Sequence, residues 1–522
     1  MLKSKKTLVL SLMLTLAFVL AISGGVYSAE KVMVIGMNTS PIVSLDPAKA
    51  YEFEGSWILD NVYDKLVRFK PGSASEIEPG IAESWEFSGN NITFTIREGA
   101  KFSNGDPVDA EAVAYSLKRV VKLAQAPSWV ITQFGITEDS IKAIGNKVQI
   151  TMDKAYSPSL VLSCMTYSVT GTVNPKVAEE HNVEGDMGMA YFTENSVGSG
   201  PYKLVSWERN QKLVFEVNEN YWGPKPEVDK IVIIDVPESS SQLLQLKGGT
   251  IDVAWNLEHD QIPDVEKTKG VYALSKPQFK LIYFAMNGQT PPTDNVLVRR
   301  AVKSAIDTEA IIKAVGGGVT ELHTFIPKGM FAHYDGEEIP YNPEKAKELL
   351  AEAGYPNGFE TTLTVPDFLS TEGTVVKSYL EQVGIKTNLE VIAYSTLLGK
   401  YRKQGLEMVI ARWGADYADP DANAKPFAHC RTTGDDASVK QLAWRNAYAN
   451  PEMTDMVEKA AFIQDRDERE KVYLELQKKW QNDGIFKILY QMTIQLGLND
   501  RVGNFILNEL TQTPWELITL KD

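Results

Sequence analysis

Cysteine and histidine are scarce in this chain of 522 residues, and their placement excludes several kinds of site. The two cysteines, Cys164 and Cys430, are too few and too far apart for a disulfide framework, and we expect both to be free thiols. The histidines include no His-Glu-x-x-His motif and no pair at metal-binding spacing; they are residues 181, 259, 323, 333 and 429. We therefore expect neither a zinc site nor any other metal or cofactor.

Catalytic signatures and basic side chains are also missing. The chain has no Gly-x-Ser-x-Gly elbow, no Walker loop and no Gly-x-Gly-x-x-Gly after a predicted strand. We therefore do not expect an enzyme; a secreted hydrolase is the alternative from a different class. Without residues 1–29, which carry three lysines and no acid, 50 basic and 68 acidic side chains remain, a net charge of −18. This balance argues against nucleic-acid binding, which needs a clustered basic surface.

Long apolar runs are confined to the first residues. Three lysines precede an almost unbroken apolar stretch over residues 7–22, and small residues follow up to Ala29. This order predicts a secretory signal peptide over residues 1–29; the alternative, a membrane anchor, needs about 20 apolar residues. Because no cysteine precedes Cys164, a lipid-attachment cysteine is missing. We expect a freely diffusing periplasmic protein that is not a lipoprotein.

Alternating strand and helix patterns predict an α/β protein. Because the roughly 490 residues after the signal peptide exceed what one hydrophobic core usually holds, we expect two or three domains. Period-2 alternation predicts a half-buried strand at residues 92–96, and Asp109 can cap the helix that follows. Residues 230–236 form a continuous apolar run, typical of a strand buried on both faces. Residues 342–359 predict a helix capped by Asn342, and residues 484–498 a strand that returns to the first sheet.

The stretch RWGADYADPDANAKPF (412–427) follows a predicted buried strand at residues 408–413, and such strand ends carry ligand sites in open α/β sheets. Its acidic residues permit a metal loop, a carboxylate pair for glycoside hydrolysis, or an anchor for a positively charged ligand. A plain surface loop is the structural alternative. An EF-hand calcium loop fails at two positions, because Ala424 replaces the required glycine and Cys430 replaces the bidentate glutamate.

Several longer blocks resemble those of one family, the extracytoplasmic solute-binding proteins of the peptide/nickel type (family 5), which serve ABC importers. The most specific block, residues 81–119, contains Ala-x-Ser-Trp, Thr-Phe-x-Ile-Arg and Phe-Ser-Asn-Gly elements. The others follow in the family's order and are residues 197–207 with 218–223, 298–307, 342–359 and 412–427. The likeness covers nearly the whole chain after the predicted signal peptide.

The resemblance implies an α/β, two-lobed periplasmic-binding-protein fold of type II, hinged between the lobes. Residues 30–65, 197–285 and 490–522 would form the first lobe, and residues 66–196 a subdomain added to it. Residues 286–489 would form the second lobe. Two strands would join the lobes, and hinge closure would enclose the ligand.

The resemblance also implies a ligand site. In peptide-binding members, the aspartate of a Trp-x-x-Asp-Tyr pattern holds the peptide's α-ammonium group, and the neighbouring backbone pairs with the peptide as a strand. Residues 413–417 match this pattern, so Asp416 is the expected ammonium anchor, with backbone contacts from Arg412 and Gly414. The full set of expected ligand-binding residues is Asp416, Trp413, Gly414, Arg412, Tyr417, Asn287, Tyr51 and Ser40.

One departure from the family's pattern bears on ligand length. Dipeptide-binding members close the far end of the cleft with an arginine that holds the ligand carboxylate. The corresponding residues 364–382 contain no arginine, and Lys377 is their only basic residue. Arg412 is a candidate substitute, whereas Asp419 and Asp421 are interpreted as residues that shape the loop.

These observations predict a binding protein, not a catalyst. We expect a monomer without cofactor that captures oligopeptides or related amine-bearing ligands in a cleft between its lobes. It would deliver them to the permease subunits of an ABC transporter. An oligosaccharide-binding member of the same family is the alternative.

Overall fold

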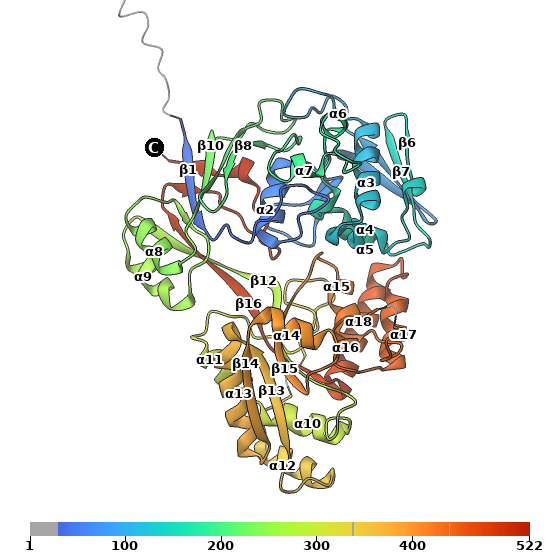
Figure 1. The fold of residues 1–522 in the computed structure, drawn as a ribbon, viewed down its shortest axis with the longest axis vertical. Helices are drawn as coiled ribbons and strands as arrows, with labels where there is room; N and C mark the ends of the chain where they lie inside the picture. The colour runs from blue at the N-terminus through green and yellow to red at the C-terminus, as the bar shows by residue number, and fades with distance from the viewer. Residues whose placement is uncertain (1–29, 337–338, 438, 522) are drawn as a thin grey trace, which may run out of the picture.

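The computed structural model describes residues 30–336, 339–437 and 439–521, so the predicted signal peptide lies outside the described residues. One ten-stranded sheet runs through the molecule (Figure 1). Its strands in spatial order are β14 (Lys386–Ile392), β13 (Glu360–Pro366), β15 (Met408–Gly414), β12 (Val271–Met286), β16 (Phe486–Asn499), β11 (Val253–Ala254), β1 (Val32–Met37), β10 (Lys230–Asp235), β9 (Lys212–Val217) and β8 (Tyr202–Glu208).

Two long strands connect the two halves of the molecule. β12 and β16 pair antiparallel from Val271 opposite Asn499 to Ala285 opposite Phe486 and pass from the upper to the lower half (Figure 1). Their register shifts between Pro277 and Leu281, where the chain leaves one half and enters the other. Register shifts of this kind bend and twist a strand pair. The result is two α/β lobes that share one sheet.

The first lobe, the upper half in Figure 1, encloses an aromatic core. Trp57 of α2 (Phe53–Val62) packs 4.2 Å from Trp255 and 5.1 Å from Trp515, measured between ring centroids. Trp515 is fully buried, although it stands only seven residues from the end of the chain. The last residues return to this lobe as β17 (Val502–Gly503) and β18 (Thr519–Leu520), so both ends of the described chain build it.

A smaller domain is attached to this lobe. Its sheet has the order β4 (Ala82–Ser88), β5 (Asn91–Ile96), β7 (Lys147–Thr151), β6 (Ile141–Ile144), and α3 (Ala110–Leu123) packs against it. The predicted alternation in β5 and the predicted cap of α3 are confirmed: every second residue of β5 is buried, and the Ala112 N–H donates to the Asp109 carboxylate at 2.9 Å. Arg119 of α3 forms a buried, bidentate ion pair with Asp46, which fixes the domain to the loop after β1.

The remaining elements of the first lobe cover its sheets. β2 (Val67–Phe69) and β3 (Ile77–Pro79) form a two-stranded sheet of their own. The helices are α4 (Trp129–Thr132), α5 (Pro158–Met165), α6 (Pro175–Glu180), α7 (Met189–Phe192), α8 (Ser239–Lys247) and α9 (Ile262–Lys267). The prediction that residues 230–236 are buried on both faces is wrong, because β10 alternates between buried and partly exposed residues.

The second lobe packs helices on β13, β14 and β15 and on the ends of β12 and β16 (Figure 1). They are α10 (Val296–Ala305), α11 (Thr308–Ala314), α12 (Pro343–Glu352), α13 (Ser370–Gln382), α14 (Tyr394–Tyr401), α15 (Asp421–Ala428), α16 (Leu442–Arg445), α17 (Pro451–Ala460) and α18 (Arg466–Asp483). The predicted cap of α12 is confirmed, since the Lys345 N–H donates to the Asn342 side chain at 2.9 Å. No helix of the described residues is long and apolar enough to cross a membrane.

The two lobes are in contact on the side of the attached domain. The Ser157 N–H donates to the Ala461 carbonyl at 2.8 Å, and the Tyr156 and Phe462 rings lie 4.9 Å apart. A single apolar cluster continues from the attached domain into the second lobe. The structure therefore describes the lobes in a closed arrangement. Both cysteines are buried free thiols, as predicted.

Candidate functional site

The carboxyl end of β15 offers an unpaired backbone edge at the junction of the lobes. β13 pairs with β15 only at Met408 and Val409 and then diverges. On the other side β15 pairs with β12, and the Ala415 N–H donates to the Phe279 carbonyl at 2.9 Å. In an antiparallel pair, the backbone N–H and C=O groups of successive residues point alternately toward the partner strand and away from it. Because Ala415 bonds to β12, the backbone groups of Arg412 and Gly414 point away from β12. Within the described part of the chain, none of these groups has a hydrogen-bond partner.

Asp416 follows this edge and faces the first lobe. Burial raises the pKa of its carboxyl from 3.8 to about 7, and the nearby Tyr51 hydroxyl lowers the pKa only in part. The Trp129 indole N–H of the attached domain donates to the Tyr51 hydroxyl at 2.9 Å. Among the described residues, no basic side chain forms an ion pair with Asp416. The site therefore holds an acid whose charge has no counter-charge from the protein.

A groove continues from Arg412 along the junction of the lobes. Its floor is formed by β12 and β16, and its walls come from the first lobe near His259 and from the second lobe near Gly318 and Phe368. Its lining residues on the two long strands include Ile282 and Tyr490, which pair with each other. Arg412 thus belongs both to the free edge of β15 and to the lining of the groove.

Trp413 and Tyr417 belong to the site's framework. Trp413 points to the face of the sheet opposite Arg412 and packs edge-on to Phe427 at 6.4 Å. Tyr417 is buried, and its hydroxyl donates to the Asp421 carboxylate at 3.0 Å. Both side chains therefore hold the loop on the second lobe, while Asp416 between them faces the first lobe.

The structure does not bring Asn287 together with Asp416, and the hydrogen bonds of Ser40 are local to its own loop. Ser40 lies in the exposed loop after β1, and its hydroxyl donates to the Asn38 side chain at 2.7 Å. Asn287 is buried beyond the opposite end of β12, where it bonds the Gln404 and Leu406 carbonyls. On β12, Lys280 stands opposite Gly414 at the site, and Met286 stands opposite Met408 at the other end of the pairing. At about 3.3 Å per residue, Asn287 therefore lies about 20 Å along the strand from the site. The assignment of Asn287 to the cleft is therefore corrected: it is a structural residue.

Asp419 and Asp421 are bound by protein groups, in agreement with their interpretation as residues that shape the loop. Arg469 of α18 holds Asp419 in a bidentate, fully buried ion pair with N–O distances of 2.5 and 2.7 Å. Asp421 receives the Tyr417 hydroxyl and its own N–H donates to Asp419. These contacts fix the loop that presents Asp416.

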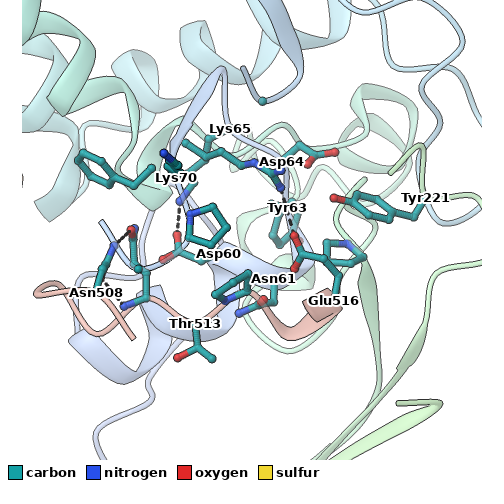
Figure 2. Close-up of a pocket in the computed structure, with 18 residues that line it drawn as sticks. Asp60, Asn61, Tyr63, Asp64, Lys65, Lys70, Tyr221, Asn508, Thr513 and Glu516 are labelled. Atoms are coloured by element: carbon teal, nitrogen blue, oxygen red, sulfur yellow. Dashed lines mark hydrogen bonds and ion pairs between the residues drawn. The ribbon is translucent and has the colours of Figure 1, made fainter. Parts of the chain in front are cut away.

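A second hollow lies within the first lobe, between α2 and the last residues of the chain (Figure 2). Its charged side chains are paired with one another: Lys65 binds Asp60 at 2.5 Å, and Arg68 binds Glu516 at 3.1 Å. Asp64, whose pKa burial raises to about 6, accepts the Trp222 indole N–H at 2.7 Å. Because its charges are satisfied internally, this hollow serves to tie α2 to the chain end.

The structure adds site residues that the sequence did not indicate. Trp129 supports Tyr51, and Lys280 and Phe53 lie beside Gly414. A Cβ atom on Gly414 would lie 2.9 Å from Phe53 and 3.3 Å from Lys280, so a larger residue there would require these side chains to shift. These residues come from distant parts of the chain, and no local pattern links them.

The molecule has two lobes joined by a hinge, and a groove lies between them. The free edge of β15 and the Asp416 carboxyl, which has no counter-charge from the described residues, lie at the same junction. These features define a solute-binding protein. A family model described as bacterial extracellular solute-binding proteins, family 5 middle, matches residues 76–435. The chain belongs to this family. It is therefore an extracytoplasmic binding protein and not an enzyme, and the predicted family is confirmed.

Known relatives match over most of their length. The probable D,D-dipeptide-binding periplasmic protein DdpA of Escherichia coli (strain K12) is 28% identical over 97% of this chain and 98% of its own. Heme-binding protein A of Haemophilus influenzae is 28% identical over 80% of this chain and 79% of its own. The periplasmic binding protein DppA of Helicobacter pylori, solved with the peptide STSA, is 26% identical with a TM-score of 0.77, over 94% and 98%. This structural likeness confirms the predicted fold class.

Proposed function

We propose that this protein captures oligopeptides, or related ligands with a free amino group, and delivers them to the permease subunits of an ABC transporter. The observation that carries this proposal is Asp416, a carboxyl with a pKa raised to about 7 by burial and with no ion pair to a cation among the described residues. An ammonium group supplies the missing counter-charge. Family membership and relatives named for dipeptide and peptide binding support the same ligand class.

The free edge of β15 suits the backbone of such a ligand. A peptide laid along Arg412 and Gly414 would add one strand to the sheet and satisfy the unpaired backbone groups there. Recognition through the main chain accepts many sequences, because side chains point away from the strand edge. Tyr51 would hold the carboxyl of Asp416 in place, and Trp413 and Tyr417 would hold the loop.

Closure of the lobes would enclose the ligand. We assign residues 30–65, 197–285 and 490–522 to the first lobe, 66–196 to the attached domain and 286–489 to the second lobe. In this scheme β12 and β16 act as the hinge, and Asp416 and Tyr51 meet only when the lobes close. We further propose that the mature protein is a periplasmic monomer without a lipid anchor.

The aromatic residues of the groove argue against an oligosaccharide as its ligand. Phe53 beside Gly414 and Phe368 in the groove are 42% and 48% exposed, so their rings could stack on a sugar. One face of each ring is already in contact with a cation, since Lys280 lies 3.9 Å from the Phe53 centroid and Arg412 lies 5.0 Å from that of Phe368. Cations on ring faces leave less room for sugar stacking.

Mass spectrometry of the small molecules that co-purify with the protein tests this function. The ligands are released from gently purified protein by denaturation and identified by mass. A ladder of short peptides is the expected result. A single species with hexose spacing would overturn the peptide assignment and would leave the transport role intact.

A further inference from the structure

The two walls of the groove meet at His259. This residue begins the helical turn η4 (His259–Gln261) of the first lobe, and its ring lies against residues 316–318 of the second lobe, which are three successive glycines. A Cβ atom on Gly318 would lie 2.8 Å from the His259 Cβ and closer still to the ring, and one on Gly317 would lie 3.5 Å from the ring Nε2. The imidazole therefore occupies the space in which side chains at these two positions would stand.

The three glycines are required for two different reasons. Their φ angles are +88° at Gly316, +78° at Gly317 and +66° at Gly318, a left-handed backbone that favours glycine. A Cβ atom on Gly316 would meet no atom within 4 Å. Backbone conformation alone thus explains Gly316, whereas Gly318 must in addition leave room for His259.

The residues after the glycines follow β16 across the hinge. The Thr320 N–H donates to the Gln491 carbonyl at 2.8 Å, and the Gln491 N–H donates to the Thr320 carbonyl at 2.7 Å. The Gln495 side chain donates to the Gly318 carbonyl at 3.1 Å. Gln491 and Gln495 stand on opposite sides of the register shift at which the long strands pass between the lobes. Residues 316–320, the hinge strap, therefore span this point alongside the strands.

His259 is held by the first lobe. The Glu258 N–H donates to the Gln261 side chain at 2.8 Å, and Leu257 and Ile262 on either side belong to the apolar cluster around α8 and α9. A rotation of the lobes about β12 and β16 therefore moves His259 relative to the hinge strap. The ring Nδ1 is buried and has no hydrogen-bond partner in the described part of the chain, so packing makes the contact. An unpaired buried polar atom costs free energy, which keeps the contact reversible.

We propose that His259 and the hinge strap form a closing contact that stabilises the closed arrangement of the lobes. The contact involves neither Asp416 nor the free edge of β15, so it acts on lobe closure and not on ligand recognition. A contact made only in the closed form shifts the population toward that form, whichever ligand is bound. The inference rests on the lobe closure of the proposed function and is independent of the ligand's chemistry. The hinge strap would set how much ligand is needed to close the protein.

Small-angle X-ray scattering tests the hinge strap, because open and closed lobes differ in radius of gyration. The full mature protein, freed of co-purified molecules, is titrated with tri-alanine, and the closed fraction is measured at each concentration. The wild type is compared with Gly318→Ala, His259→Ala and the variant that carries both changes. Gly316→Ala is the matched control, since it places the same side chain on the same left-handed backbone but meets no neighbour within 4 Å.

We expect Gly318→Ala and His259→Ala to need about tenfold more tri-alanine than Gly316→Ala for the same closed fraction. The double variant should need no more than His259→Ala alone, because the added methyl group then has no ring to displace. If Gly318→Ala does not fold, His259→Ala is compared with His181→Ala, which changes an exposed histidine of the attached domain.

The hinge strap is overturned if either Gly318→Ala or His259→Ala closes as readily as its control, or if Gly318→Ala weakens closure further when His259 is already absent. A wild type that is closed before tri-alanine is added supports the strap if Gly318→Ala opens it, and overturns the strap if it does not. A wild type that stays open at every tri-alanine concentration would overturn the strap together with the proposed peptide ligand.

Discussion

Replacing Asp416 by asparagine is expected to weaken ligand binding and to stabilise the empty protein, an unusual pair of effects. The substitution keeps the shape of the side chain and its ability to accept the Tyr51 hydroxyl, but removes the charge. In the closed site the ligand ammonium would lose its partner, and stranding one member of a buried ion pair costs about 3–5 kcal/mol. This corresponds to a loss of affinity of about 150- to 4,000-fold.

The gain in stability follows from the pKa of the same carboxyl. The pKa rises from 3.8 to about 7 on folding, and each unit is equivalent to about 1.4 kcal/mol, so the ionised group destabilises the empty protein by at most about 4 kcal/mol. Because the side chain is partly open to the junction, we expect about 1–2 kcal/mol. The folded carboxyl holds its proton more tightly than the unfolded one, so this cost is absent below pH 3.8 and complete above pH 7.

Calorimetric titration and chemical denaturation at pH 5 and pH 8 measure the two effects. The Asp435→Asn variant is the matched control, since Asp435 is exposed and the change in charge is the same. Asp416→Asn should unfold at higher denaturant than the wild type at pH 8, with a smaller difference at pH 5. Unchanged peptide affinity would refute the anchor, and lower stability at pH 8 would refute the argument from burial.

Three further predictions follow from particular contacts. Peptide affinity should rise about tenfold per pH unit up to pH 7, because the ammonium group binds ionised Asp416; calorimetric titrations from pH 5 to pH 7 check this. Asp419→Asn should destabilise the fold by about 3–5 kcal/mol, because it leaves the buried Arg469 guanidinium without its partner, as measured by urea denaturation. Trp515→Ala should cost about 3–5 kcal/mol in the same assay by opening a cavity in the first lobe, whereas Lys521→Ala at the exposed chain end should cost less than about 0.5 kcal/mol.

Local signals in the sequence were sufficient for many of the elements. The side-chain caps of α3 and α12 and the alternation in β5 depend on residues only a few positions apart, and all three are confirmed. The strand before the Trp-x-x-Asp-Tyr pattern was also predicted close to its observed bounds, Met408–Gly414. By contrast, the polar residues and Pro277 in the first half of β12 interrupt the apolar pattern that marks its second half, so the full length of this strand cannot be read from local sequence.

The composition of the site depends on tertiary register, which the sequence does not display. Phe53 and Lys280 meet at Gly414 although the three residues lie far apart in the chain. Asn287 was misplaced for the same reason, since it belongs to a loop of the expected type at the opposite end of the strand from Asp416. A resemblance to a family identifies which residues match a motif. Which residues lie close together in space is decided by how the strands pair.

The contribution of the last residues to the first lobe affects when this protein becomes folded. Trp57 and Trp255, which are synthesised early, complete their core only with Trp515, and Lys31 at the start of β1 bonds the Leu520 carbonyl. A growing chain that has released 500 residues still lacks these contacts. The first lobe therefore cannot complete its core until the last residues have been synthesised, after every residue of the second lobe. For a member of an extracellular family, this delay matches the need to cross a membrane as an unfolded thread before reaching its native form.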